Sequence, residues 1–185
     1  CLFLHDSLTF YCLTADNELL ATATFEEGLG GNLTLQGETI TLTNETRLIA
    51  DTFGTGQSGS VTIQGRNIDL SETSQIGTVT FGSGNGGELR VTATESIDIR
   101  GHMVSGEDIF FSGLFASAET GSTGAAGIVY VTTPSLSIRD GGTVSVNTFG
   151  PGDAGCIVIR ACQIEVADPV ISSDATISGV VALVL

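Results

Sequence analysis

A 28-residue repeat is the feature that most constrains this chain, because it sets the spacing of glycine and phenylalanine residues. The spacing separates the members of three sets: Phe25, Phe53 and Phe81; Gly31, Gly59 and Gly87; Gly127 and Gly155. Between Gly87 and Gly127 the interval is 40 residues, or one repeat plus 12 residues. We expect one extra residue within 92–96 and the others between about 101 and 111. A fixed period of this length predicts a solenoid.

Each repeat contains three segments in which apolar residues alternate with polar ones, as in strands with one buried face. The first segment carries Leu33/Leu35, Val61/Ile63, Leu89/Val91, Val129/Val131 and Ile157/Ile159. The second carries Ile40/Leu42, Ile68/Leu70, Ile97/Ile99, Leu136/Ile138 and Ile164/Val166. In the third we align Leu48, Ile76, Ala116 and Val144, then Thr24, Thr52, Thr80, Thr120, Thr148 and Thr176, then Phe25, Phe53, Phe81, Gly121, Phe149 and Ile177.

These patterns predict an all-β fold, a single-stranded parallel β-helix with three short strands in each 28-residue rung and about five to six rungs. One rung cannot bury its inner face alone, whereas stacked rungs pair every backbone group and align identical side chains. We expect phenylalanine rings stacked on one another and threonine hydroxyls bonded to their neighbours in a ladder. We expect residues 1–185 to be one such domain, cut from a longer chain, with irregular ends at 1–13 and 179–185.

The pattern Thr-Phe-Gly-x-Gly-x-x-Gly-x-Ø-x-Ø, where Ø is apolar, occurs at 52–63, 80–91 and 148–159. It resembles the repeats of filamentous-haemagglutinin-type exoproteins, above all the longer cyanobacterial variety, whose characteristic insertion is similar to residues 112–117. The resemblance covers roughly residues 14–178. It implies a right-handed parallel β-helix that is exported by two-partner secretion through an outer-membrane transporter and remains outside the Gram-negative cell.

Composition narrows the possible partners. The formal net charge is −15, and all six basic residues are arginine. Nucleic acids and anionic lipid surfaces attract basic faces, so both are disfavoured as partners. The sequence has no apolar run of 18 residues, so it predicts no transmembrane helix.

Two repeated patterns imitate functional motifs. G-x-G-x-x-G occurs at 54–59, 82–87 and 150–155, but each copy leads into a strand, whereas a dinucleotide site needs a following helix. We interpret the three copies as tight corners. Asp69, Asp98 and Glu165 fall at one outward position, where we favour a solvated charged face over a calcium site or an acid–base pair.

The cysteines and histidines give no clear site. Cys1, Cys12, Cys156 and Cys162 lack metal-binding spacing, and we favour free buried thiols over local bridges within each pair. His5 and His102 form no recognisable catalytic set. We therefore expect no cofactor and no metal.

The insertion at about 101–112 is the one aperiodic segment, and binding residues concentrate where a loop departs from a scaffold. Its candidate binding residues are His102, Glu107, Asp108, Phe110 and Phe111. The alternative is that the insertion's apolar side chains simply pack back on the rod.

The sequence favours a non-enzymatic shaft of a secreted, surface-associated adhesin, with glycans or proteins on host or neighbouring cells as partners. Two other interpretations stay open. One is a carbohydrate-active enzyme of the pectin-lyase type, which would need clustered Asp, Arg and Lys on irregular loops. The other is a carbohydrate-binding module that uses the aromatic residues of the insertion.

Overall fold

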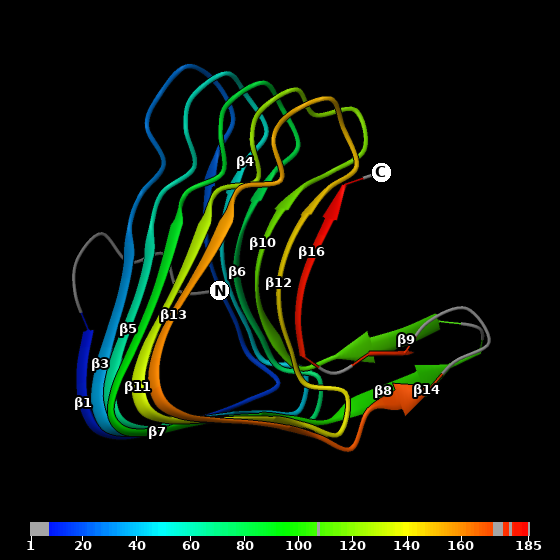
Figure 1. Cartoon of the computed structure of the whole chain (residues 1–185). Coiled ribbons are helices and arrows are strands. Elements are labelled where there is room, and N and C mark those ends of the chain that lie inside the picture. The colour runs from blue at the N-terminus through cyan, green and yellow to red at the C-terminus, as the bar shows by residue number, and fades with distance from the viewer. Residues whose placement is uncertain (1–7, 107, 172–175, 178, 185) are drawn as a thin grey trace.

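The computed structural model describes residues 8–106, 108–171, 176–177 and 179–184, and it contains no helix in these ranges. Two parallel six-stranded sheets make up the body (Figure 1). Sheet A contains β1 (Leu8–Asp16), β3 (Leu33–Thr43), β5 (Val61–Leu70), β7 (Glu88–Arg100), β11 (Ile128–Arg139) and β13 (Cys156–Ala167). Sheet B contains β2 (Leu19–Thr24), β4 (Arg47–Thr52), β6 (Gln75–Thr80), β10 (Gly113–Ala118), β12 (Thr143–Thr148) and β16 (Gly179–Val184).

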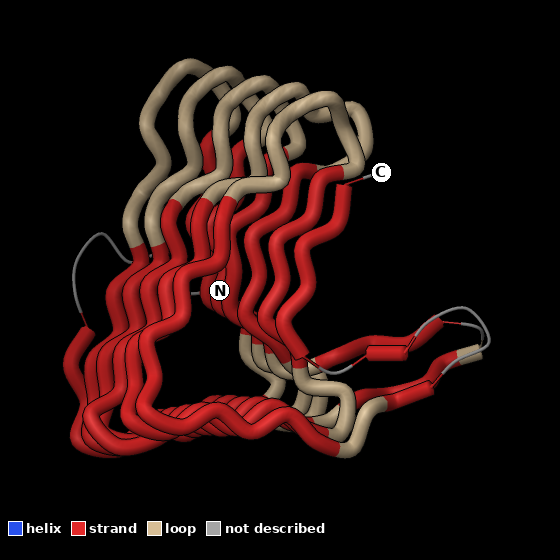
Figure 2. The backbone as a smooth tube through the Cα atoms, in the orientation of Figure 1, coloured by secondary structure: helices blue, strands red, loops and turns tan. Residues whose placement is uncertain are grey.

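Each rung consists of one long strand in sheet A and one short strand in sheet B. The long strand bends, so the first two predicted segments form two sides of a three-sided coil, and the short strand forms the third (Figure 2). Leu33 pairs with Val61 and Val61 with Leu89, which is the 28-residue spacing of the sequence. The predicted parallel β-helix is therefore confirmed. Residues 8–13 and 179–184, expected to be irregular, lie in β1 and β16.

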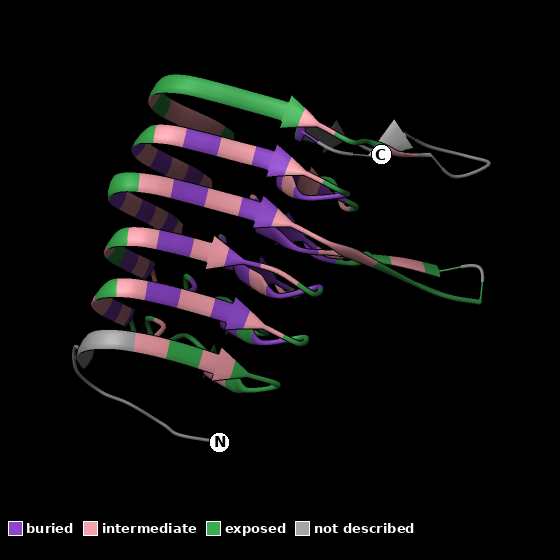
Figure 3. Cartoon of the chain, turned by 90° about the horizontal axis from the view of Figure 1, so that it is seen from below, coloured by how far each residue is buried: buried purple, intermediate pink, exposed green. Residues whose placement is uncertain are grey.

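The core is built from the inward columns of leucine, isoleucine and valine, as the alternation predicts. Ile63, Ile68, Ile76 and Leu89 are fully buried, and the next residue along each strand of sheet A is more exposed (Figure 3). In β13, the last described strand of sheet A, the equivalent Ile164 is half-exposed. Each internal rung is therefore covered by its two neighbours, and stacking buries what a single rung cannot.

The Thr column closes the glycine corners rather than forming a ladder between rungs, so that expectation was wrong. Thr52 Oγ1 donates to the carbonyl oxygen of Gly56 at 2.7 Å, and Thr80 Oγ1 to that of Gly84 at 2.5 Å. A buried hydroxyl needs a partner, and in both rungs the corner carbonyl four residues later accepts this bond.

The corner glycines are required by close contact between rungs. A Cβ on Gly56 would lie 1.9 Å from the carbonyl oxygen of Gly28, and one on Gly84 would lie 1.9 Å from that of Gly56. Gly56 and Gly84 have no positive φ, whereas Gly155, the last residue of the third copy, has a φ of +93°. Because each corner leads into a strand of sheet A, its interpretation as a structural turn is confirmed.

In the fourth rung, the third segment pairs two residues away from the predicted alignment. Leu114, not Ala116, pairs with Ile76, and Ala118, not Thr120, pairs with Thr80. One of the 12 extra residues lies between Ala93 and Ser96, as predicted, since Gly65 pairs with Ala93 but Asn67 with Ser96. Nine more of these extra residues lie between β7 of sheet A and β10 of sheet B. The last two lie in the turn after Ala118, where the amide N–H of Ser122 bonds to the carbonyl oxygen of Glu119. That turn absorbs two residues outside the strand pairing, so the 28-residue spacing alone places the third segment of this rung two residues off.

The sixth rung contains a second insertion that the sequence analysis missed. Thr176 and Ile177 form β15 (Thr176–Ile177), which pairs antiparallel with β14 (Val170–Ile171). Val184, not Thr176, therefore pairs with Thr148.

The Phe column is stacked, as predicted, but on the outside of the coil. The ring centroids of Phe25 and Phe53 lie 5.2 Å apart, and those of Phe53 and Phe81 lie 4.7 Å apart, with nearly parallel planes. These rings are 70%, 44% and 43% exposed. Glu119 follows Ala118 as Phe81 follows Thr80, so Glu119, not Gly121, interrupts the column in the fourth rung.

Candidate binding surface beside the hairpin

The predicted insertion is an antiparallel hairpin that projects from the corner between sheets A and B (Figures 1 and 3). Its strands are β8 (His102–Ser105) and β9 (Asp108–Phe111), in which His102 pairs with Phe111 and Met103 with Phe110. At its base, the amide N–H of Ser112 bonds to the carbonyl oxygen of Gly101 at 2.9 Å. This bond closes the hairpin, so the ladders of both sheets continue past it.

The structure separates the predicted binding residues into different environments. His102 and Phe111 lie at the hairpin base against Gly141, where a Cβ would be 2.9 Å from His102 Cβ and 3.2 Å from Phe111 Cδ1. His102 Nδ1 lies 3.2 Å from Asp140 Oδ1. Asp108 is exposed near the tip, and Glu107 lies outside the described residues. The four described residues therefore do not form one cluster.

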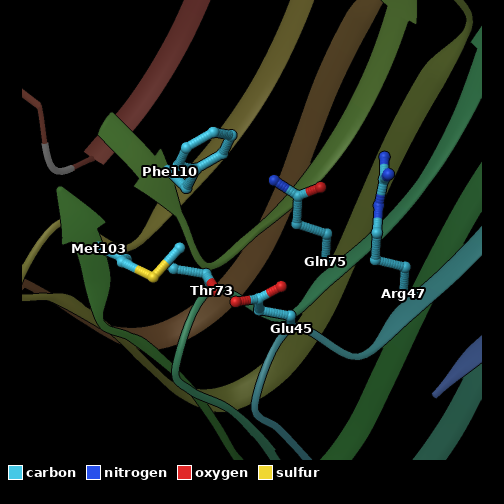
Figure 4. A pocket seen from close by; sticks show the side chains of 6 residues that line it. All are labelled: Glu45, Arg47, Thr73, Gln75, Met103 and Phe110. Atoms are coloured by element: carbon cyan, nitrogen blue, oxygen red, sulfur yellow. The ribbon is translucent and has the colours of Figure 1, made fainter. Parts of the chain in front are cut away.

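Phe110 lines a small cavity between the hairpin and the preceding turns. This cavity has a volume of about 210 Å³ and is lined by Glu45, Arg47, Thr73, Gln75, Met103 and Phe110. Figure 4 shows Phe110 and Met103 extending from the hairpin, with Gln75 and Arg47 standing off neighbouring strands of sheet B. Phe110 remains 45% exposed, so the expected packing of apolar side chains back on the rod is incomplete.

A larger groove adjoins this cavity and shares Arg47 and Gln75 with it. The groove has a volume of about 300 Å³ and lies over the outward residues of β6, β10 and β12. Its lining comprises Arg47, Gln75, Val79, Phe81, Phe111, Gly113, Phe115, Ser117, Glu119, Thr143, Ser145, Asn147 and Phe149. Of the predicted residues that the structure describes, only Phe111 contributes to it.

Phe115 is the central aromatic residue of the groove. It is outward-facing in β10 and pairs with Gly77 on one side and Ser145 on the other. A Cβ on Gly77 would lie 2.6 Å from Phe115 Cε1 and 2.7 Å from Cζ. The ring therefore lies over Gly77, where the absence of a side chain on β6 gives it room.

Polar side chains surround this ring. Gln75 Nε2 donates to the backbone oxygen of Phe111 at 3.2 Å, which ties the groove to the hairpin. Ser117 Oγ donates to Glu119 Oε1 at 2.6 Å, and Asn147 Nδ2 lies 3.5 Å from Ser145 Oγ. Hydrogen-bonding groups thus lie along both sides of an apolar centre, the composition typical of ligand sites.

One carboxylate close to the groove has a perturbed acidity. Asp51 points outward from β4 beside Val79, and its Oδ1 is buried without a hydrogen-bond partner. Burial raises the pKa of Asp51 to about 6, and the nearby Arg47 partly opposes the rise.

The predicted acidic column is a half-exposed ion-pair ladder. Arg100 Nη1 lies 2.6 Å from Asp69 Oδ2 and 2.8 Å from Asp98 Oδ2, and Arg139 Nη2 lies 2.6 Å from Asp98 Oδ2. Hydrogen bonding to these carboxylates raises the pKa of both arginines. Within the described part of the chain, no group of three or more His, Cys, Asp or Glu side chains could hold a metal ion.

Cys156 and Cys162 are free, as favoured, but exposed rather than buried. Cys156 and Cys162 lie six residues apart in the single strand β13, so a bridge between them is excluded by the rise of a strand, about 3.3 Å per residue. Cys1 lies outside the described residues.

Sequence reasoning missed Phe115 because the third segment of the fourth rung was aligned two residues off. It missed Gln75 and Asn147, which lie in the neighbouring rungs, because only the structure places them in one groove with Phe115. With the observed register, Phe115 stands where neighbouring rungs have glycine and serine, and Glu119 where they have phenylalanine. These departures from the repeat were the available signal.

The comparisons with known proteins identify no relative: no family model, curated protein or solved structure matches this chain. Among the described residues, no helix is long and apolar enough to cross a membrane.

Proposed function

We propose that this chain is a non-enzymatic shaft segment of a secreted, surface-associated exoprotein of the filamentous-haemagglutinin type. The observation that carries the proposal is the unbroken parallel pairing of both sheets through all six rungs. Each internal rung adds the same length and buries the same columns, so the coil acts as a rod whose length is set by the number of repeats.

The outer surface suits this role. The net charge of −15 and the Asp69, Asp98, Arg100 and Arg139 ladder give the rod a hydrated, charged wall. Both hairpins branch from the corner between the two sheets without interrupting the ladders. A shaft can therefore carry them away from a cell surface while its core stays regular.

A length-extension experiment tests the shaft. Three additional copies of residues 61–88, inserted after Glu88, should keep the far-ultraviolet circular dichroism of a β-protein and lengthen the particle by about 14 Å in small-angle X-ray scattering. Copies that form a separate or unfolded body would contradict the proposal. So would release of products from polysaccharides at enzymatic rates by the unmodified chain.

Location is tested separately on the source cells. Antibody to this chain should label intact cells, and external protease should remove the label. Labelling that appears only after lysis would refute the surface assignment while leaving the rod intact.

A further inference from the structure

The groove on sheet B lies where neighbouring rungs carry different outward residues. In the column that contains Phe115, the flanking rungs carry Gly77 and Ser145. In the Phe column, Glu119 stands between Phe81 and Phe149. A purely structural wall would repeat its outward residues, whereas this one combines an aromatic substitution and an acidic one at a single place.

The groove runs along the axis of the coil. Its lining residues come from four successive rungs, beginning at Arg47 in β4 and ending with Asn147 in β12. Three rung steps of ~4.8 Å span about 14 Å, which is longer than one small ring and matches a segment of an extended polymer.

The chemistry of the lining narrows the polymer to a class. A pyranose ring has one apolar face of C–H groups and a rim of hydroxyl groups. The face can lie on a phenylalanine ring such as that of Phe115, and the rim can bond to amides and carboxylates such as Gln75, Asn147 and Glu119. The net charge of −15 opposes an anionic polymer.

We propose that the outer face of β6, β10 and β12 binds a neutral polysaccharide along the axis of the coil, with Phe115 as the stacking platform. Gln75, Asn147 and Glu119 bond to the hydroxyl rim, and Phe81 and Phe149 border the groove at the glycine corner. Glu119 is the one carboxylate among the described residues that line the groove. Asp51 lies close by but is not part of the lining, and glycoside hydrolysis generally uses two carboxylates that flank the bond, so we expect the site to bind the chain without cleaving it.

Isothermal titration of the chain with soluble neutral polysaccharides (hydroxyethyl cellulose, galactomannan and mixed-linkage glucan) and with polygalacturonate tests the site. We expect at least one neutral polymer to bind and polygalacturonate not to bind. Phe115→Ala should weaken the binding at least about tenfold, and Asn147→Ala several-fold. Phe25→Ala is the matched control, because this exposed Phe lies outside the groove and should leave affinity unchanged.

Gly77→Val provides an independent test that does not remove the aromatic ring. Its side chain would occupy the space of the Phe115 ring, so affinity should fall while circular dichroism remains that of the parent. Absence of binding to every neutral polymer, binding of polygalacturonate alone, or unchanged affinity in folded Phe115→Ala overturns the proposal. These outcomes leave the shaft proposal standing, because that proposal does not depend on a ligand.

Discussion

Replacement of a corner glycine by alanine tests whether close stacking of rungs explains the glycine repeats. Gly28, Gly56 and Gly84 occupy equivalent corners of successive rungs. A Cβ on Gly84 would lie 1.9 Å from the carbonyl oxygen of Gly56, and Cβ contacts under 3.0 Å essentially never occur. A Cβ on Gly28 would have no neighbour within 4 Å.

The magnitude follows from the displacement that Gly84→Ala requires. The facing carbonyl must move by about 1 Å, and overpacking of this kind costs about 1–3 kcal/mol. The bond from the Gly84 amide N–H to the carbonyl oxygen of Gly54, 3.0 Å long, is strained by the same movement, at a further ~1 kcal/mol. Alanine also lowers the conformational entropy of the unfolded chain, which offsets about 0.5–1 kcal/mol of this loss of stability. We expect a net loss of about 2 kcal/mol.

The matched control is Gly28→Ala, which changes the unfolded chain in the same way without the clash. It should leave the free energy of unfolding unchanged or raise it by up to about 1 kcal/mol. Urea unfolding followed by far-ultraviolet circular dichroism measures both variants. Equal midpoints for Gly84→Ala and Gly28→Ala would refute the close-stacking explanation.

Four further outcomes are expected. Asp98→Asn removes the centre of the ladder with Arg100 and Arg139, and it should lower the free energy of unfolding by ~0.5–1 kcal/mol in low-salt urea titrations and by less in molar salt. The pKa of Asp51 is about 6 in the folded state, above its ordinary value of 3.8, so the folded protein binds a proton at Asp51 more tightly than the unfolded chain does. Protonation of Asp51 therefore stabilises the fold; this stabilisation is complete below about pH 4 and is lost as pH rises through 6. Asp51→Asn should therefore raise the free energy of unfolding near neutral pH by on the order of 1 kcal/mol and flatten the pH dependence measured by thermal unfolding; an unchanged pH profile would contradict the buried carboxylate. Phe53→Ala should cost ~1–1.5 kcal/mol, and more than Phe25→Ala, because Phe53 stacks on two rings and Phe25 is described against one; equal losses in urea would show that stacking contributes nothing. Replacement of residues 102–111 by a single glycine should restore a turn like that at Asp140 and Gly141 and leave the circular dichroism unchanged, whereas loss of β-structure would show that the hairpin is part of the folding core.

The sequence by itself determined the architecture. Alternation at Leu33 and Leu35, and again at Ile40 and Leu42, repeated every 28 residues, predicts short strands with one buried face, and only stacking can bury such faces. The insertion before β10 was also visible, because a repeat reveals any residue that breaks its period. The structure confirms both features.

The tertiary structure decided where the extra residues lie, and with them the candidate site. The turn after Ala118 takes up two residues without a change in pairing, so sequence spacing alone misplaced Leu114, Phe115 and Glu119. Sequence could not show that Phe115 lies over Gly77, since that contact depends on which strands are neighbours and on a missing side chain. Nor could the sequence show that the Thr52 hydroxyl donates to the carbonyl oxygen of Gly56 in its own corner, because that bond depends on how the corner folds. A repeat therefore specifies the coil and its core, whereas the surface depends on contacts between rungs that differ.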